Sequence, residues 1–464
     1  MKKPGWISLL FIWLLLIPTG ICWAQEGRGP VYVVQPGDTL WTIAQRFGVS
    51  VDVLASYNGI NDPGQLSADA ELIIPGLTGL SGILTTQNVG YGETLRSLSR
   101  RYQTSEKLLA RLNHIVSPNE LYAGIELILP QSSQVQAGKE RVAVGAGNSL
   151  LEMAVLERAN PWALLKANSL RGIWAAIPGD ILRVPGGADD EGPGALPQTI
   201  TGIQVGPLPI TQGKTVIFRV EAPANLSLSG SFTGHELHFF ELGAGHYVAL
   251  QGVHALTEPG FYSVTLQGLL PDGTKFDFSQ LVYVRDGGYP YDPPLVVDPA
   301  TIDPAVTKPE DEQWAALVTP VTAQRYWNGK FQTPSPLGLE YGFPSLFGNR
   351  RAYNGGTYDR FHGGLDMYGD TGTEILAPAA GQVVFTGLLT VRGNAISIDH
   401  GWGVYTGFMH LSEIKVAVGD KVEPGQLIGL AGGTGRVSGP HLHFEVWVGG
   451  VQVDPLDWLM QEYP

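Results

Sequence analysis

Three histidines and an aspartate in the last third of the chain are of the types that bind a catalytic metal ion. His362 and Asp366 are four residues apart, and His441 and His443 are two residues apart. Two imidazoles and one carboxylate suit Zn²⁺, and three protein ligands leave a fourth position for water, as in catalytic sites. Residues 332–464 contain no cysteine, which excludes a closed thiolate site there.

The backbone that positions these side chains is expected to be extended. Alternate side chains of a β-strand share a face, so His441 and His443 would point the same way. His362 and Asp366 can also share a face, and the two glycines between them favour extended or turn backbone over helix. The alternative is that these are core histidines of a β domain, hydrogen-bonded within the protein.

Several blocks of this region resemble peptidase family M23, the lysostaphin-like and LytM-like zinc endopeptidases of peptidoglycan. They run from about Tyr341 to Trp458 and include FHGGLDMYGDTGTEILAPAAGQVVFTG, NAISIDHGWGVYTGFMHL and VGDKVEPGQLIGLAGGTGRVSGPHLHFEV. The resemblance implies a β-rich peptidase domain with one Zn²⁺ per chain, held by His362, Asp366 and His443.

The same resemblance implies that His410 and His441 are the catalytic histidines. One of them would take the proton of the attacking water or hydrogen-bond the developing oxyanion, and the sequence does not assign the two roles. His400, in the block IDHG, is interpreted as structural. Inactive, metal-free relatives usually lack a metal ligand, whereas all three ligand residues and both catalytic histidines are present in this sequence.

The first 186 residues contain a threefold repeat with a period of 55 residues. In the first copy, apolar residues at i, i+3, i+4 and i+7 from Leu40 predict an amphipathic helix that Gly48 ends. Ser50 can begin a second short helix, and β-prone runs flank the pair, so the predicted order is β-α-α-β. Four residue types recur at the repeat spacing: Gly37, Gly92 and Gly147; Leu40, Leu95 and Leu150; Asn58, Asn113 and Asn168; Pro75, Pro130 and Pro185.

The first two copies resemble LysM modules, which bind N-acetylglucosamine-containing glycans such as peptidoglycan. The third copy is degenerate, because Glu157 and Arg158 stand where the first copy has phenylalanine and glycine. The resemblance implies attachment to the cell wall, and the alternative is that the repeats are spacers. The implied glycan contacts lie in two loops: Gly37, Asp38, Thr39 and residues 60–65.

The composition and the net charge argue against some fold classes and some functions. The chain has 61 glycines and 33 prolines among 464 residues, which favours short strands and many turns over helical bundles. With a net charge of −14, the chain lacks the excess of basic residues that is typical of a nucleic-acid-binding protein. His235 and His238 are three residues apart in strand-like sequence, which does not fit the helical zinc-protease motif with histidines at i and i+4.

These observations predict a multidomain, mainly β protein. The predicted domains are a signal peptide over 1–24, LysM-like repeats over 30–76, 85–131 and 140–186, an immunoglobulin-like β-sandwich over 197–286, a proline-rich linker and arm over 287–331, and the peptidase domain over 332–464. The signal segment is basic, then apolar, and ends in Cys22-Trp23-Ala24; the alternative is an uncleaved membrane anchor.

The predicted function is that of a secreted or envelope-located zinc endopeptidase that cuts peptide bonds of peptidoglycan and is held on the glycan by its LysM modules. Its partner is therefore peptidoglycan, both the glycan and the stem or cross-bridge peptides. One alternative is an inactive wall-binding scaffold that activates another hydrolase. Another is a metallopeptidase that acts on proteins, against which the glycan-binding repeats argue.

Overall fold

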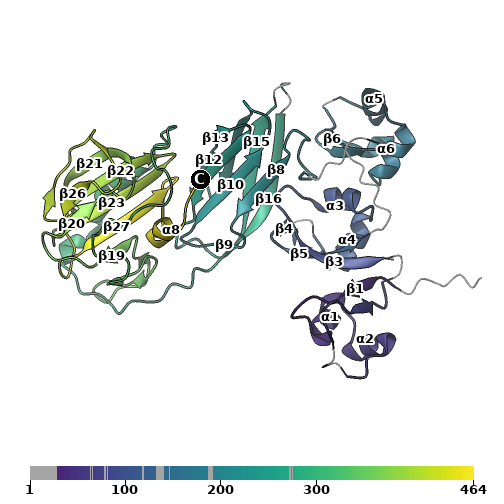
Figure 1. Ribbon diagram of the computed structural model, residues 1–464, viewed down its shortest axis with the longest axis horizontal. Coiled ribbons are helices and arrows are strands. Elements are labelled where there is room, and N and C mark those ends of the chain that lie inside the picture. The colour runs from purple at the N-terminus through teal and green to yellow at the C-terminus, as the bar shows by residue number, and fades with distance from the viewer. Residues whose placement is uncertain are drawn as a thin grey trace, which may run out of the picture. The chain divides into compact units, whose positions relative to one another are not determined.

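The computed structural model describes residues 29–464, apart from 63, 65, 78–79, 81, 118–119, 132–139, 146, 187–191, 271–272 and 274. The described chain is mainly β and divides into two compact units, one ending at Thr85 and the other running from Thr86 to Pro464 (Figure 1). The predicted signal peptide, 1–24, lies outside the described residues. No helix in the described part of the chain is both long enough and apolar enough to cross a membrane.

The first unit contains the first predicted repeat. Its elements are β1 (Val31–Val33), α1 (Leu40–Phe47), α2 (Val51–Asn58) and β2 (Glu71–Ile73), and β1 pairs antiparallel with β2. The Thr39 side chain caps α1, and Gly48 ends it with a φ of 65°, a conformation that glycine adopts without strain. Ser50 caps α2, so both helices predicted from the sequence are confirmed.

The second and third copies follow the same order of elements. After β3 (Ile83–Asn88) come α3 (Leu95–Arg101), α4 (Glu106–Leu112), β4 (Tyr122–Ala123) and β5 (Glu126–Gln131). The third copy comprises β6 (Glu140–Ala143), α5 (Leu150–Leu156), α6 (Pro161–Ala167), the short 3₁₀ helix η3 (Ile173–Ala175) and β7 (Ile181–Val184).

The recurring asparagine explains much of the repeat. Asn58 donates to the carbonyls of Leu54 and Ile73 and accepts a hydrogen bond from the amide of Ile73. Asn113 and Asn168 make the same three bonds in their own copies. Each side chain therefore joins the second helix to the closing strand, and the third copy keeps this bond pattern although other positions have diverged.

Two mainly antiparallel sheets follow, and they enclose one apolar core that includes Phe218, Phe232 and Val264. The first sheet has the order β13-β14-β10-β8, and the second has the order β12-β11-β15-β16, with β4 and β9 pairing with β16. The strands are β8 (Gly202–Gly206), β9 (Ile210–Thr211), β10 (Thr215–Glu221), β11 (Ser227–Phe232), β12 (His235–His238), β13 (Phe240–Gly243), β14 (His246–Gly252), β15 (Gly260–Leu269) and β16 (Lys275–Arg285).

The C-terminal part is built on a twisted sheet with the order β19-β27-β23-β22-β21-β25, and β28 pairs with β27. Its strands are β19 (Leu365–Met367), β21 (Gly381–Leu389), β22 (Gly393–Gly401), β23 (Val404–Leu411), β25 (Lys421–Val422), β27 (Leu442–Val448) and β28 (Val451–Val453). The smaller elements are β17 (Arg350–Arg351), β18 (Arg360–Phe361), β20 (Glu374–Leu376), β24 (Glu413–Ile414), β26 (Leu427–Leu430) and α8 (Pro455–Met460). Ile396, Phe408 and Phe444 are completely buried at the centre of the core.

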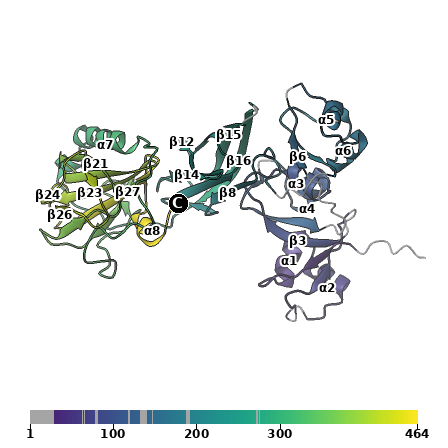
Figure 2. The same cartoon turned by 45° about the horizontal axis from the view of Figure 1, so that its top comes forward.

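The proline-rich segment before this domain is only partly extended. The prolines of the predicted linker favour extended structure, but this does not hold for Pro304 and Pro309, because the helix α7 (Pro304–Val318) contains both. Pro304 stands in the first turn, where its missing amide is not needed. Trp314 and Val318 of α7 are fully buried against residues of β22 and β23, and this burial offsets the helical hydrogen bond lost at Pro309. Figure 2 shows α7 next to β21.

The two-sheet domain and the C-terminal domain share an interface. Val248 and Leu250 of β14 belong to the same buried cluster as Trp458 of α8. The Lys214 ammonium lies 2.9 Å from a carboxylate oxygen of Asp454 and 2.9 Å from one of Asp457. The middle domain is therefore docked on the C-terminal domain through both apolar contacts and ion pairs.

We expect Lys214→Met to lower the free energy of unfolding by about 1–2 kcal/mol, because it leaves two neighbouring carboxylates without a counter-ion in a half-buried interface. Urea denaturation followed by tryptophan fluorescence measures this change. The control is Lys421→Met, at an exposed lysine that forms no ion pair with a described residue. Equal stability of the two variants would show that the ion pairs contribute nothing to docking.

Candidate active site

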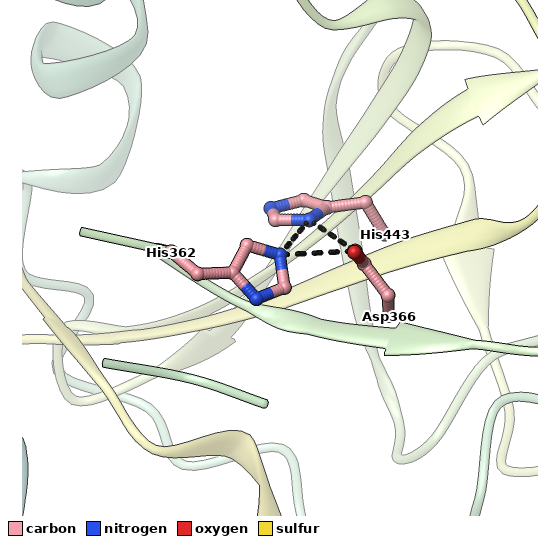
Figure 3. Close-up of side chains that lie close together, drawn as sticks. All are labelled: His362, Asp366 and His443. Atoms are coloured by element: carbon pink, nitrogen blue, oxygen red, sulfur yellow. Dashed lines mark hydrogen bonds and ion pairs between the residues drawn. The ribbon is translucent and has the colours of Figure 1, made fainter. Parts of the chain in front are cut away.

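His362, Asp366 and His443 bring three potential metal-ligand atoms together (Figure 3). Asp366 Oδ1 lies 3.0 Å from His362 Nε2 and 2.8 Å from His443 Nδ1, and the two nitrogens are 2.9 Å apart. All three residues are buried or nearly so. The three residues predicted as ligands, which are up to 81 positions apart in the sequence, thus form one cluster.

Strand pairing produces this convergence. β19 lies antiparallel to β27, and Asp366 is directly opposite His443 in the register, so the two side chains emerge on the same face. Gly364 lies so close to β27 that a Cβ atom there would be 2.4 Å from the carbonyl oxygen of Phe444 and 2.8 Å from His443 Nε2. The glycine is therefore needed for close backbone approach, in agreement with the extended backbone expected for this segment.

The outward nitrogens of both histidines have partners that orient the rings. His362 Nδ1 lies 2.8 Å from the backbone carbonyl of Leu346, to which it can donate a hydrogen bond. His443 Nε2 is 3.2 Å from Glu445 Oε1. Such contacts fix which ring nitrogen faces the metal. The sequence reasoning missed both; Glu445 could have been found, since it is two residues after His443 on the same strand.

The cluster contains a carboxylate that suits a cation. Although burial favours its neutral form, His362 and His443 hold the pKa of Asp366 well below its usual range, so it is a carboxylate. Burial lowers the pKa of His362, which keeps this ring neutral and able to offer a lone pair. Although burial lowers it, hydrogen bonds to Asp366 and Glu445 raise the pKa of His443 to about 9, so a metal ion would displace a proton from this ring on binding. A buried carboxylate between two imidazoles is the donor set that zinc prefers, so these residues fit a divalent metal ion.

His410 and His441 lie beside the cluster, with their ring centroids 5.1 Å apart. His441 Nε2 is 3.5 Å from Asp366 Oδ1, so His441 and His443 point to the same face, as the sequence predicted. His410 Nδ1 can donate to the carbonyl of Thr434 at 2.8 Å and His441 Nδ1 to that of Gly439 at 2.9 Å. Both rings thereby keep their Nε2 atoms for another partner.

His410 has two further features of a functional residue. Its φ of 65° places a non-glycine residue in the left-handed region, which is uncommon and often found at functional sites. Burial lowers the pKa of its imidazole to about 3, so the ring is neutral at pH 7.

His400 differs from the other four histidines of this domain. Its Nδ1 is 2.8 Å from the carbonyl of Ala380, and its Nε2 is 2.8 Å from the hydroxyl of Thr406. Both nitrogens are therefore engaged inside the core, which agrees with its interpretation as a structural residue.

The four site histidines line one cleft with a volume of 1080 Å³. Its walls come from the loop 435–440, from β17 and the residues around it, and from residues 292–301 of the segment that precedes α7. The segment from Tyr291 to Leu295 is held there by isolated bridges to Arg350 and Tyr353. The cleft is large enough to admit a peptide chain.

The predicted glycan contacts Gly37, Asp38 and Thr39 lie in the first unit, in the turn between β1 and α1. Asp38 accepts hydrogen bonds from the Tyr32 hydroxyl at 2.6 Å and the Gln35 amide at 2.9 Å. Gly37 has a φ of 90°. These residues thus shape the turn, and their part in glycan binding stays a prediction.

Two parts of the chain match known protein families. Residues 360–455 match the model of peptidase family M23, and residues 32–75 and 88–130 match the LysM domain. The chain is 44% identical over 95 residues to peptidoglycan DD-endopeptidase ShyA of Vibrio cholerae, which is 20% of this chain and 22% of that protein. It is 42% identical over 97 residues to the DD-carboxypeptidase/endopeptidase Mpg of Neisseria meningitidis, 21% of this chain and 22% of that one.

The matched segment spans about a fifth of the length of these curated relatives. Among solved structures, the catalytic domain of lysostaphin from Staphylococcus simulans is 31% identical, with a TM-score of 0.21, and the match covers 32% of this chain and 97% of that one. From the sequence matches we conclude that the chain carries LysM domains and a C-terminal peptidase family M23 domain.

Proposed function

We propose that this protein is a secreted, zinc-dependent endopeptidase that hydrolyses peptide bonds of peptidoglycan. The observation that carries the proposal is the convergence of His362, Asp366 and His443, with His410 and His441 beside them, on one cleft. The substrate is inferred from the LysM domains and from relatives such as ShyA, which is named a peptidoglycan DD-endopeptidase. Such a substrate lies in the cell envelope.

His362 Nε2, Asp366 Oδ1 and His443 Nδ1 would hold the metal ion. When bound, a zinc ion polarises the scissile carbonyl and makes a water molecule more acidic. Glu445 and the Leu346 carbonyl keep the two imidazoles in the tautomers that present the required nitrogens.

His410 and His441 would move the proton. In each ring the Nδ1–H donates to a backbone carbonyl, so Nε2 carries the lone pair that can take a proton from water. After accepting it, the same atom can hydrogen-bond the developing oxyanion or pass the proton to the leaving amine.

Mass spectrometry of fragments released from defined muropeptides tests the function directly. We expect fragments formed by addition of water across one amide bond, their loss with a chelator, and their return when Zn²⁺ is added. Fragments that persist in chelator would contradict metal dependence. Wall binding without any fragment would instead favour the alternative of an inactive scaffold.

We expect deletion of residues 25–80 to weaken binding to insoluble peptidoglycan by about tenfold or more, because one of the linked binding modules is lost. Turnover of a small soluble muropeptide should stay within about twofold, since the linked module contributes only local concentration. The deletion stops before Thr86, where the second compact unit begins. Equal losses in sedimentation and turnover assays would refute this division of labour.

A further inference from the structure

Three arginines line the cleft that contains the site histidines: Arg351, Arg392 and Arg436. The same cleft is also lined by five carboxylates, Asp292, Asp298, Asp311, Asp366 and Glu445, so positive charge is not in excess there. Two of the three arginines are neutralised within the protein. Arg392 lies 2.9 Å from a carboxylate oxygen of Glu310 and 2.9 Å from one of Asp311.

The guanidinium of Arg351 also has partners within the protein. Its Nε is 3.4 Å from Asp292, its Nη2 is 3.7 Å from Asp366, and the same nitrogen donates to the Ser345 hydroxyl at 2.9 Å. This guanidinium therefore supports the metal-ligand carboxylate and the linker segment, and it has little capacity left for a ligand.

Arg436 has no such partner. Its guanidinium carbon lies 4.7 Å from the ring centroid of Tyr353, and its Nη1 donates to the carbonyl of Thr301 at 3.0 Å. Among the described residues, no carboxylate lies within 4.0 Å of it. The Thr301 carbonyl therefore accepts from one of the five N–H donors of the Arg436 guanidinium, and the Tyr353 ring packs against the flat face of the guanidinium.

The surroundings of Arg436 favour an anion. Burial lowers the pKa of Arg436, Tyr353 raises it, and the guanidinium groups of Arg360, Arg351 and Arg392 lower it further, with a net lowering. The guanidinium is thus a half-buried positive charge without a carboxylate from the described residues beside it. Such a charge is costly unless an opposite charge binds beside it. A carboxylate matches the remaining donors because it accepts two parallel N–H bonds from a guanidinium.

The position of Arg436 connects it to the hydrolytic site. It lies in the loop between Gly432 and His441, two residues that form an isolated bridge. The same loop provides the Thr434 carbonyl that orients His410. A ligand group held by Arg436 is therefore positioned relative to both candidate catalytic histidines by one short, anchored segment.

We propose that Arg436 binds a free carboxylate of the substrate peptide and so selects acid-bearing stem peptides over uncharged cross-bridge peptides. This inference rests on the proposed function, since it assumes that a peptide occupies the cleft. The bound carboxylate would lie outside the amide bond that is hydrolysed. By holding it, Arg436 would orient the peptide so that the scissile amide reaches the candidate metal cluster.

The test compares a cross-linked muropeptide that has free stem carboxylates with its amidated counterpart. We expect the wild-type protein to bind and cleave the free acid about 10- to 100-fold better, as charge-assisted hydrogen bonds require. Arg436→Gln should bring this ratio close to one, chiefly through KM, and Arg436→Lys should keep part of it. Arg219→Gln, at an exposed position of β10, is the matched control.

Binding is measured by calorimetry as well as turnover, so that the two proposals can fail separately. If the wild-type protein cleaves neither peptide but still prefers to bind the free acid through Arg436, the hydrolase proposal fails and the carboxylate site stands. If it cleaves both peptides equally well, or if Arg436→Gln lowers kcat on both to the same degree, the carboxylate site is refuted while the hydrolase proposal stands.

Discussion

His443→Ala is expected to lose bound zinc and at least about a thousandfold of turnover, since metal polarisation contributes several kcal/mol and each 1.4 kcal/mol is a factor of ten. Nδ1 of His443 lies within 3.0 Å of both other ligand atoms, so its removal leaves only two ligands. Two protein ligands do not complete a catalytic zinc site. Elemental analysis of the purified variant and muropeptide turnover report the two losses independently.

A graded series makes this prediction sharper. Glu445→Gln keeps all three ligands but weakens the contact with His443 Nε2, and loss of such a support typically costs about 10- to 100-fold in metal affinity or activity. His238→Ala, at an exposed histidine of β12, should match the wild-type protein. A His443→Ala variant that retains zinc and turnover would overturn the assignment of the cluster as the metal site.

The candidate metal cluster could be anticipated because its residues lie in short sequence blocks with strong local constraints. The alternation at His441 and His443 follows from strand geometry alone. The sequence did not reveal that Asp366 faces His443, because the register between β19 and β27 depends on the pairing of distant segments. The contact of His362 with the Leu346 carbonyl could not be predicted either. Every residue has a backbone carbonyl, so the residue type at position 346 gives no indication that its carbonyl accepts this hydrogen bond.

The helix α7 shows where local reasoning failed. Proline at 304 and 309 argues against helix in an isolated segment. The buried contacts of Trp314 with the C-terminal domain override that preference, and such tertiary contacts are not visible in a propensity argument. By contrast, the caps at Thr39 and Ser50 act within one turn, so they could be predicted residue by residue.

The linker that contains α7 also supports the candidate catalytic site. The carboxylate of Glu310, on α7, accepts hydrogen bonds from the amides of Val391 and Arg392. The carbonyl of Arg392 in turn accepts the amide hydrogen bond of His410. The left-handed backbone at His410 is thus held in place by a helix more than 90 residues earlier in the chain, which no motif in the sequence indicates.

His410→Ala and His441→Ala are each expected to lower turnover by about 10²- to 10⁴-fold, the usual contribution of general acid–base catalysis. Zinc content should be unchanged in both, because neither residue belongs to the set of three ligand atoms. This outcome separates them from His443→Ala, which should lose metal and turnover together. Zinc loss in either variant would contradict the division between ligands and proton-transfer groups.

The double variant then tells whether the two histidines share one task. If both act on the same proton, removing the second after the first costs little, because residues that work as a unit have non-additive effects. If one takes the proton of the water while the other hydrogen-bonds the oxyanion, the two losses should multiply. Their rings are 5.1 Å apart and each keeps its Nε2 for another partner, so the geometry allows two separate contacts with one substrate. We therefore expect the losses to multiply.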